Sequence, residues 1–526
     1  MSYAGHIIEL PVGSDGLTGT KNLSQAKPQQ LLQATNLTYE NGTLQKEGGT
    51  ALYSSGAIIS TGTSILAGVD WNPSEGVQRQ IIVAGTGRVL RDTGGGTFPT
   101  VMVSGLNFTD TVPVFVEGGA EAQGNPRLLF LISKKNAIRT CSGDSTTMKV
   151  LVSGAADWTG SDQPVSGMIH ENRLWACKDH RWYYSKTTNH KSFVSGDAGQ
   201  LNVYPGEGEE LVGGISFKGV IVTWKKPLGL YVIDTSSTTI ANWRVTRLTG
   251  AIGGFSPYSA VIIDDDILFM DNGGNLHLIS TVTEFGDVGS RNLSQMADLG
   301  PFIRENFNLA HLDIVRSVYY SAKRQAHIAM ASLGSSVNNR RLVVDFNRLD
   351  IPRFSVSTRD VCQSLWLKKD ANNIPRPVYG NNTGDVFLMD QEVRTHDGAG
   401  YNGQFQTPHT DLSFADQTLG TKRKMGDFLE LVVEPKGDWN LNVDILWDGA
   451  IRDTVTFNMG ETGATLGSFI LDTDVLGGDQ VLNKKRRITG SGRRISLQGR
   501  NSAVGEDFSV AKMYLHFRVS DERLEA

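Results

Sequence analysis

Short apolar runs alternate with turns rich in glycine and asparagine along most of this chain. Each unit has an apolar run, a turn and a second apolar run, as where Gly85-Thr86-Gly87-Arg88 leads into Val89-Leu90. The second runs of five consecutive units begin 49, 44, 48 and 46 residues apart, at Val89, Ile138, Trp182, Leu230 and Leu276. A period in the forties, with about four short strands per unit, is the signature of propeller blades. The pattern therefore predicts an all-β fold built on a β-propeller.

The extent of the repeat sets the size of the predicted propeller. A sixth clear unit has its turn at residues 381–385 and its second run at Val386, 110 residues after Leu276, which is two units of 55. Apolar runs between residues 313 and 357 supply further strands in that gap. We therefore expect about six or seven blades, together occupying residues 61–395.

Two short elements depart from the blade pattern. Residues 1–60 precede the first blade, and within them Asn41-Gly42 is a strong hairpin signal at the tip of residues 38–49. A weak helical pattern covers residues 29–36. Apolar residues at helical spacing then recur near 292–310, where Pro301 is suited to begin a helical turn. This segment predicts one short helix inserted between blades.

The texture of the chain changes near residue 396. Apolar runs become longer, as in residues 428–434, 441–447 and 508–519, and short turns such as Asp448-Gly449 separate several of them. Long antiparallel strands joined by short turns over this length are typical of a β-sandwich. We therefore predict a separate C-terminal sandwich over residues 396–526.

Composition narrows the class of protein. The net charge of −5 over 526 residues argues against a protein that coats nucleic acid through overall positive charge. Three cysteines, Cys141, Cys177 and Cys362, are too few for a disulfide framework and fit folding in a reducing cytoplasm. The N-terminal residues lack a signal-peptide pattern, and no run of 18 apolar residues predicts a membrane span.

Candidate chemistry is sparse. His170, His180 and His190 recur every ten residues, whereas metal ligands usually sit two to five residues apart, so turns and strand ends explain them better. The acidic run 264–266 fits a hairpin turn and lacks the calcium-loop pattern. Residues 195–199, Ser-Gly-Asp-Ala-Gly, match the start of a sialidase Asp-box, but Asn202 stands where that motif has an aromatic residue. We expect no catalytic residue, metal or cofactor, and no enzymatic activity.

Two basic runs are the best contact candidates. They consist of Lys422, Arg423 and Lys424, and of Lys484, Lys485, Arg486 and Arg487. Three interpretations are open: a solvated face, a seam of ion pairs between subunits, and a patch that contacts phosphate. If the chain formed a channel through which DNA passes, such a patch should not hold the DNA tightly, because each neutralised phosphate adds affinity. Subunit contacts are therefore favoured over a phosphate contact, with Glu430, Glu434 and the acidic run 264–266 as possible partners, and the solvated face stays open.

Three stretches together resemble a family of viral proteins. Residues 36–49, Asn-Leu-Thr-Tyr-Glu-Asn-Gly-Thr-Leu-Gln-Lys-Glu-Gly-Gly, resemble an N-terminal element of phage tail propeller proteins, although Glu47 replaces their usual basic residue or proline. Residues 378–390 look like the last blade of those proteins. The run 421–424 leading into 428–431 is similar to the start of their C-terminal sandwich. The arrangement resembles the tail nozzle and packaged-DNA-stabilising proteins of short-tailed bacteriophages.

The resemblance implies a structural role in the virion. Such proteins, made in the host bacterial cytoplasm, form a ring, expected here to be a hexamer, below the portal and adaptor. The ring would retain packaged double-stranded DNA, conduct it during ejection, and meet tail fibre or needle proteins. One alternative is a receptor- or carbohydrate-binding propeller, for which Trp175, Trp182 and Tyr183 are the candidate exposed aromatics. The other alternative is a propeller glycosidase.

Overall fold

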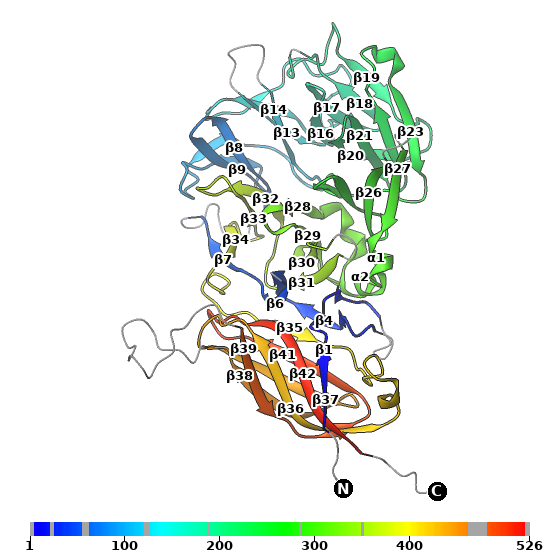
Figure 1. Ribbon diagram of the computed structural model, residues 1–526. Coiled ribbons are helices and arrows are strands. Elements are labelled where there is room, and N and C mark those ends of the chain that lie inside the picture. Colours follow the sequence, from blue (N-terminus) through cyan, green and yellow to red (C-terminus); the bar gives the residue numbers. More distant parts are fainter. Residues whose placement is uncertain are drawn as a thin grey trace.

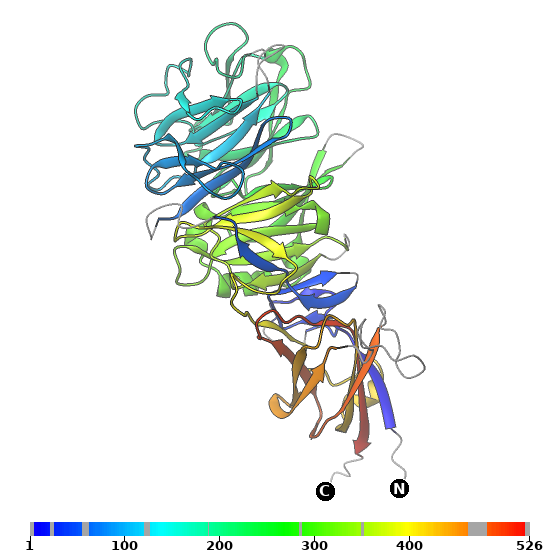
Figure 2. The ribbon, with the colours of Figure 1, turned by 90° about the vertical axis from the view of Figure 1, so that its left-hand side faces the viewer.

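The chain is almost entirely β-structure, arranged as a ring of blades with two further sheets attached at one side (Figure 1). The computed structural model describes residues 5–20, 26–40, 42–54, 63–119, 127–187, 189–282, 287–348, 352–460 and 481–520. Viewed from the side, the molecule is elongated, and β1 (Gly5–Leu10) lies at the end remote from the blades (Figure 2).

Five blades follow one another along the chain, each a four-stranded antiparallel sheet whose strands are in sequence order. The first comprises β8 (Ile65–Ser74), β9 (Val77–Ala84), β10 (Arg88–Arg91) and β11 (Thr100–Val103). The second comprises β12 (Val114–Gly118), β13 (Leu128–Ser133), β14 (Asn136–Ser142) and β15 (Lys149–Val150). The third comprises β16 (Ser166–His170), β17 (Arg173–Lys178), β18 (Arg181–Tyr184) and β19 (Gly199–Asn202). The fourth comprises β20 (Glu210–Phe217), β21 (Val220–Lys226), β22 (Leu230–Asp234) and β23 (Arg244–Thr249). The fifth comprises β24 (Ala260–Ile263), β25 (Asp266–Met270), β26 (Leu276–Val282) and β27 (Asp287–Asn292).

Two more blades complete the ring. The sixth comprises β28 (Arg316–Tyr320), β29 (Gln325–Ala331), β30 (Asn338–Asp345) and β31 (Arg353–Ser357), and its sheet continues beyond the propeller. The seventh comprises β32 (Ser364–Lys369), β33 (Pro375–Gly380), β34 (Val386–Gln391) and the N-terminal strand β7 (Gly49–Leu52). The innermost strands contact one another in sequence, and β32 contacts β8. The predicted propeller is therefore confirmed, with its last blade closed by a strand from before residue 61.

Buried tryptophans join neighbouring blades. The indole nitrogen of Trp71 donates to the Gly143 carbonyl at 3.1 Å, and that of Trp182 donates to Thr223 Oγ1 at 3.0 Å. At the point of closure, Trp366 Nε1 donates to Gln80 Oε1 at 2.9 Å. Each indole side chain buries a large apolar area, and its single polar atom, the ring nitrogen, has a hydrogen-bond partner, as a buried tryptophan requires. These side chains make the blade interfaces specific as well as apolar.

Two side chains cross the centre of the ring. Arg316 on the sixth blade donates from NH2 to the Leu66 carbonyl on the first blade at 3.0 Å. Tyr258, just before the fifth blade, donates to the Pro113 carbonyl, just before the second, at 3.3 Å. The Arg316 guanidinium lies 5.0 Å from the centroid of the Tyr258 ring. The axis of the propeller is therefore occupied by side chains at this level.

Two larger sheets form the end remote from the blades. One contains β39 (Leu482–Arg487), β36 (Arg423–Val433), β42 (Ser509–Ser520), β6 (Thr43–Lys46) and β5 (Leu37–Glu40), with β1 beside β42 and β40 (Ser491–Gly492) beside β36. The other extends the sixth blade from β31 through β4 (Gln33–Thr35), β35 (Gly403–Gln406), β41 (Ile495–Asn501), β37 (Asn440–Trp447) and β38 (Ala450–Asn458). Leu431 and Leu515 of the first sheet share one buried apolar cluster with Val443 and Leu497 of the second.

The boundary predicted at residue 396 is not a boundary in the strand pairing. β4 pairs with β31 of the sixth blade on one side and with β35 on the other, so one sheet runs through both regions. Residues 5–46 also supply β1, β5 and β6 to the opposite sheet. The C-terminal residues therefore do not form a sandwich by themselves, because strands from the N-terminal segment complete both sheets.

The remaining short elements qualify the sequence predictions. The predicted helix near 292–310 is present as α1 (Leu293–Met296) and α2 (Gly300–Asn306), with a left-handed residue, Asp298, between them. The helical pattern expected at 29–36 is instead β3 (Gln30–Leu31) and β4, and β3 pairs with β2 (Gly16–Leu17). The 3₁₀ turns are η1 (Ile240–Asn242), η2 (Leu309–Ile314), η3 (Ser321–Lys323) and η4 (Gln417–Leu419). The hairpin at 38–49 is confirmed as β5–β6, although its tip residue Asn41 lies outside the described residues.

The closing strand generates a prediction at Gly49. A methyl group added there would lie 1.8 Å from the Val393 carbonyl oxygen, so β7 would have to move away from the chain after β34. We expect Gly49→Ala to lower the free energy of unfolding by about 1–3 kcal/mol, the usual cost of overpacking. Urea denaturation would measure it. Gly95→Ala is the control, because an added methyl there meets nothing within 4 Å; equal midpoints for the two variants would contradict the prediction.

Candidate functional site

The second basic run forms an edge strand whose side chains alternate between two environments. In β39, Lys484 donates from Nζ to the Gly460 carbonyl at 2.8 Å, and Arg486 donates from Nε to the Thr456 carbonyl of β38 at 3.2 Å. Lys485 lies on the opposite side, with Nζ 4.8 Å from the centroid of the Phe428 ring, and Arg487 is exposed there. Lys485 and Arg487 of this run therefore share one side of the sheet, whereas Lys484 and the exposed Arg486 lie on the other side and bind carbonyls of β38 and the residues that follow it.

The first basic run is likewise divided. Lys424 is fully buried, and its Nζ donates to the carbonyls of Asp411 and Arg493, both at 2.7 Å. Burial lowers the pKa of Lys424 to about 8, although Asp411 opposes the shift. Arg423 is exposed and bonds to Ser491 Oγ at 3.1 Å, while Lys422 is half-buried. The prediction that Lys424 contacts a subunit or DNA is therefore wrong, because this ammonium group joins two loops inside the molecule.

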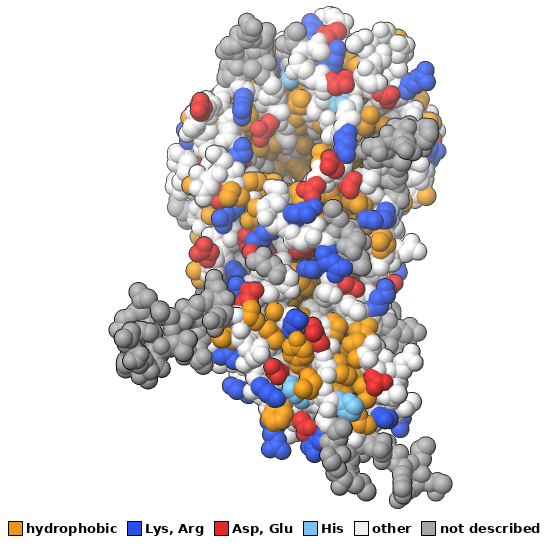
Figure 3. All heavy atoms as spheres, in the orientation of Figure 1, with side chains coloured by type: hydrophobic (Ala, Val, Ile, Leu, Met, Phe, Trp, Pro, Cys, Tyr) orange, Lys and Arg blue, Asp and Glu red, His pale blue; other side chains and the backbone are white. Residues whose placement is uncertain are grey.

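Lys485 and Arg487 belong to an open sheet surface, which we call the outer face. It is the side of β39, β36, β42 and β1 that points away from the buried cluster. Arg487, Phe428, His516 and Ile7 lie directly opposite one another across the four strands, as do Lys485, Glu430, Tyr514 and Glu9. Ile7 is 63% exposed, Met425 45% and Phe428 39%. Figure 3 shows hydrophobic side chains gathered on this part of the surface among charged ones.

Several residues singled out by sequence are structural. His170 is buried between Ser216 Oγ and Thr235 Oγ1, at 2.8 and 2.6 Å, and burial lowers its pKa to about 4. No metal-ligand cluster occurs among the residues that the structure describes. Trp175, Trp182 and Tyr183, the candidate aromatics for receptor binding, are all buried. They therefore form strand core and offer no aromatic surface.

The two acidic turns bind neighbouring strands. Asp264 accepts hydrogen bonds from Tyr319 and Arg324 at 2.8 and 2.7 Å, so it joins the fifth blade to the sixth. Although partial burial opposes the shift, these bonds lower the pKa of Asp264. Asp197, in the Asp-box-like turn, accepts a hydrogen bond from Arg173 at 2.9 Å and another from Thr187. Neither carboxylate is free for an ion pair with another subunit or for chemistry on a substrate.

A cluster of buried charge lies where three segments of the chain meet. Arg341 of β30 is fully buried, and its NH2 donates to Glu47 Oε1 and to Asp360 Oδ2, both at 2.7 Å. Arg359, also buried, lies 3.5 Å from each of these carboxylates. Two cations and two anions thus form a cluster that is neutral overall. Burial alone would raise the pKa of Asp360, but Arg359 and Arg341 hold it at about 2.

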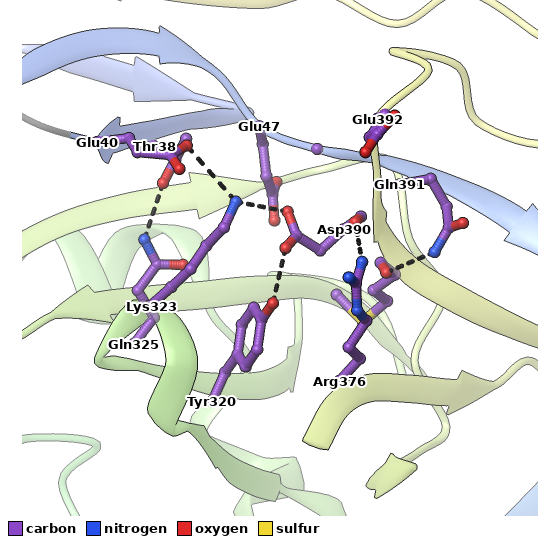
Figure 4. A network of polar contacts seen from close by, with 12 residues as sticks. Thr38, Glu40, Glu47, Tyr320, Lys323, Gln325, Arg376, Asp390, Gln391 and Glu392 are labelled. Carbon is purple, nitrogen blue, oxygen red and sulfur yellow. Dashed lines mark hydrogen bonds and ion pairs between the residues drawn. The ribbon is translucent and has the colours of Figure 1, made fainter. Parts of the chain in front are cut away.

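A polar cleft, which we call the junction cleft, lies among the same parts of the chain. It has a volume of about 400 Å³ and lies between the N-terminal hairpin, the last two blades and the C-terminal sheets. Its lining includes Glu40, Lys323, Asp390, Glu392, Glu434 and Trp439. Figure 4 shows Tyr320 and Lys323 converging on Asp390, with Glu40 beside Lys323. Tyr320 and Lys323 donate to the two Asp390 oxygens at 2.9 and 2.7 Å.

Neither the cluster nor the cleft was predicted from sequence. Their members lie far apart in the chain, and only the pairing of β6 and β7 with later strands brings them together. One signal was available at Glu47, which departs from the pattern of the resembling family. In the structure this carboxylate is largely buried, and Arg341 and Arg359 supply the cations that a buried carboxylate requires.

Comparisons with known proteins assign no family to this chain. No family model matches the chain, and no curated protein matches it. Among solved structures, YCF48 bound to D1 peptide aligns with 12% identity and a TM-score of 0.38, covering 68% of this chain and 97% of that one. The WD40 β-propeller domain of Doa1 aligns with 11% identity and a TM-score of 0.39, covering 65% and 97%. In the described part of the chain, no helix is long and apolar enough to cross a membrane.

The buried charge cluster predicts a large effect at Arg341. Arg341→Met would leave Glu47 and Asp360 buried beside only one cation, so we expect the free energy of unfolding to fall by about 3–5 kcal/mol. Lys134→Met, which removes an exposed pair with Glu210, should cost no more than about 1 kcal/mol. Urea denaturation would measure both. Adding Asp360→Asn to Arg341→Met should recover part of the loss; a further full loss would contradict the charge argument.

Lys424 predicts a specific pH dependence. Its pKa is about 8 in the folded protein and near 10.4 in an unfolded chain. Between these two pKa values the unfolded chain binds more protons than the folded protein, so the free energy of unfolding increases as pH rises from about 8 to about 10.4. The same contribution is lost as pH falls through about 8. The unfolding midpoint of the parent, relative to Lys424→Met, should therefore increase from pH 7 to pH 10. The same comparison with the exposed residue Lys149 should be flat; a flat result at Lys424 would refute the shift.

Proposed function

We propose that this protein is a structural component of a short bacteriophage tail, a nozzle subunit that assembles with copies of itself into a ring. The ring would retain packaged double-stranded DNA and conduct it during ejection, below the portal and adaptor and in contact with tail fibre or needle proteins. A hexamer and a virion location are part of the proposal. No chemical reaction is included, because the site residues support none.

The outer face is the observation that carries the proposal. Sheet surfaces that face water normally alternate polar residues with the buried ones, yet this one exposes Ile7, Met425 and Phe428 among charged side chains. Apolar surface of this kind, rimmed by polar groups, marks a contact with another protein. Lys485 and Arg487 add charge at one edge of the same surface. A ring needs such a contact repeated from copy to copy.

The resemblance to nozzle proteins supports the same assignment. The resembling segment 36–49 forms β5 and β6 and leads directly into β7, and the segment 378–390 contributes to the blade that β7 closes. Both segments thus lie at the closure of the ring of blades. The third segment leads into β36, which lies in the middle of the outer face.

The occupied propeller axis bears on where DNA would pass. Arg316 joins the sixth blade to the first and Tyr258 joins the segment before the fifth blade to the segment before the second, so the axis of a single subunit is a poor conduit. We place the conduit between copies, where a ring of subunits encloses it. A hydrated channel lined by several copies would let DNA pass without the tight grip that many phosphate contacts create.

The alternatives have lost their specific support. A receptor-binding propeller was suggested by aromatic residues that are buried, and a glycosidase by a turn whose Asp197 binds Arg173 and Thr187. Both alternatives remain distinguishable from the ring by mass. Native mass spectrometry or light scattering of the purified protein would separate a hexamer from a monomer.

The outer face yields a prediction for assembly. Reversing only Lys485 and Arg487 to Glu should weaken ring formation, more strongly at low salt, where charge is least screened. The fold should survive, because each exposed charge contributes only about 0–1 kcal/mol. Analytical ultracentrifugation over a range of salt concentrations would measure it. The control reverses Arg88 and Lys149, two exposed residues of the propeller; equal assembly of the two variants would remove these residues from the contact.

A further inference from the structure

We infer that the junction cleft binds a cationic group, an alkylammonium or guanidinium carried by an extended segment of a protein partner or by a linear polyamine. The inference does not rest on the proposed ring, because it is argued from residues of a single chain. It rests on three properties of the lining: occupied cations, unoccupied acceptors, and an aromatic wall.

The cations of the cleft are already bound within the chain. Lys323 Nζ lies 2.7 Å from Asp390 Oδ1. Arg394 donates from Nε to Asp507 Oδ2 at 3.0 Å, and its NH1 donates to the carbonyls of Gln391 and Glu392. Arg376 donates from Nε to Asp370 at 3.0 Å, and the fourth lining cation, Lys436, forms an ion pair with Glu434 at 3.6 Å. These groups have little capacity left for an anionic ligand, which argues against phosphate or an acidic peptide.

The acceptors, in contrast, exceed the donors. Glu392 is exposed and makes no ion pair or side-chain hydrogen bond among the described residues. Glu40 lies 3.7 Å from the Lys323 ammonium group and accepts a hydrogen bond from Gln45. Glu434 lies 3.6 Å from Lys436 and accepts a hydrogen bond from Ser509 Oγ at 3.4 Å, so Glu392 is the carboxylate of the lining that keeps its full capacity. Gln45 is 98% buried, its amide nitrogen donates to Glu40 at 2.7 Å, and its Oε1 has no partner. A buried acceptor without a donor is costly, and a ligand that brings N–H groups would relieve that cost.

The third property is Trp439, whose half-buried ring lines the same cleft. An indole face attracts a cation, and the attraction is stronger where water is excluded. Carboxylates at the mouth, an unpaired amide oxygen inside and an aromatic wall together form a site for a lysine or arginine side chain. The cleft volume of about 400 Å³ is within the range of ligand pockets and leaves room for part of the segment that carries the cation.

Fluorescence anisotropy with a labelled peptide, Gly-Arg-Gly-Lys-Gly, would test the inference on the full chain. The matched peptide carries citrulline and acetyl-lysine, which keep the shape and remove the charge. We expect the cationic peptide to bind at least tenfold more tightly than the neutral one. The double variant Glu392→Gln, Glu434→Gln should weaken binding at least tenfold, and Trp439→Leu severalfold, whereas Glu75→Gln, an exposed carboxylate on the first blade, should leave it unchanged.

The outcomes separate the sources of the cation and can overturn the inference. Displacement of the peptide by spermidine, at the same concentration of positive charge, would identify a polyamine site. Resistance to spermidine would identify a site that also contacts the peptide backbone. Thermal unfolding of each variant would establish that the fold is retained. Three results would overturn the proposal: no binding of either cation at 1 mM, equal binding of the neutral peptide, or equal loss of binding in Glu75→Gln. None of these results would depend on whether the protein forms a ring.

Discussion

The fold depends on a cluster of four buried charges, in which Arg341 and Arg359 neutralise Glu47 and Asp360. A buried charge is tolerated only when partners replace its water. The four residues come from three places: Glu47 from the N-terminal hairpin, Arg341 from the sixth blade, and Arg359 with Asp360 from the connection to the seventh. The cluster can therefore form only when the hairpin, the sixth blade and that connection are all in their native positions. Formation of the cluster thus couples the positions of these three parts.

The N-terminal segment that contains this hairpin explains why the molecule is one structural unit. Residues 5–52 contribute β1, β4, β5, β6 and β7, which between them enter both C-terminal sheets and the last blade. The last blade is complete only when the N-terminal strand β7 pairs with β34. Other strands of the same N-terminal segment complete the C-terminal sheets. The junction cleft lies at the meeting point because several chain segments converge there without filling the space between them.

The surface chemistry follows from the two-residue period of β39. A run of four basic residues looks uniform in sequence, but a strand sends alternate side chains to opposite sides. Lys484 and Arg486 cap carbonyls of β38 and the segment after it, and only Lys485 and Arg487 reach the outer face. The same logic, applied to a strand end, removes Lys424 from the surface altogether.

The amino-acid sequence by itself determined the fold class, because a repeat in the forties with turns at fixed places reflects local physics: short strands, tight turns and alternating burial. It also placed the short helical insert and the hairpin at 38–49. It did not reveal which strands pair across the chain, so the extension of the sixth blade through β4 to β38 and the closure by β7 were decided only in three dimensions. The charge cluster and the junction cleft have the same origin. Their residues carry no local pattern, since partners as distant as Glu47 and Arg341 become neighbours only when non-local strand pairing brings them together.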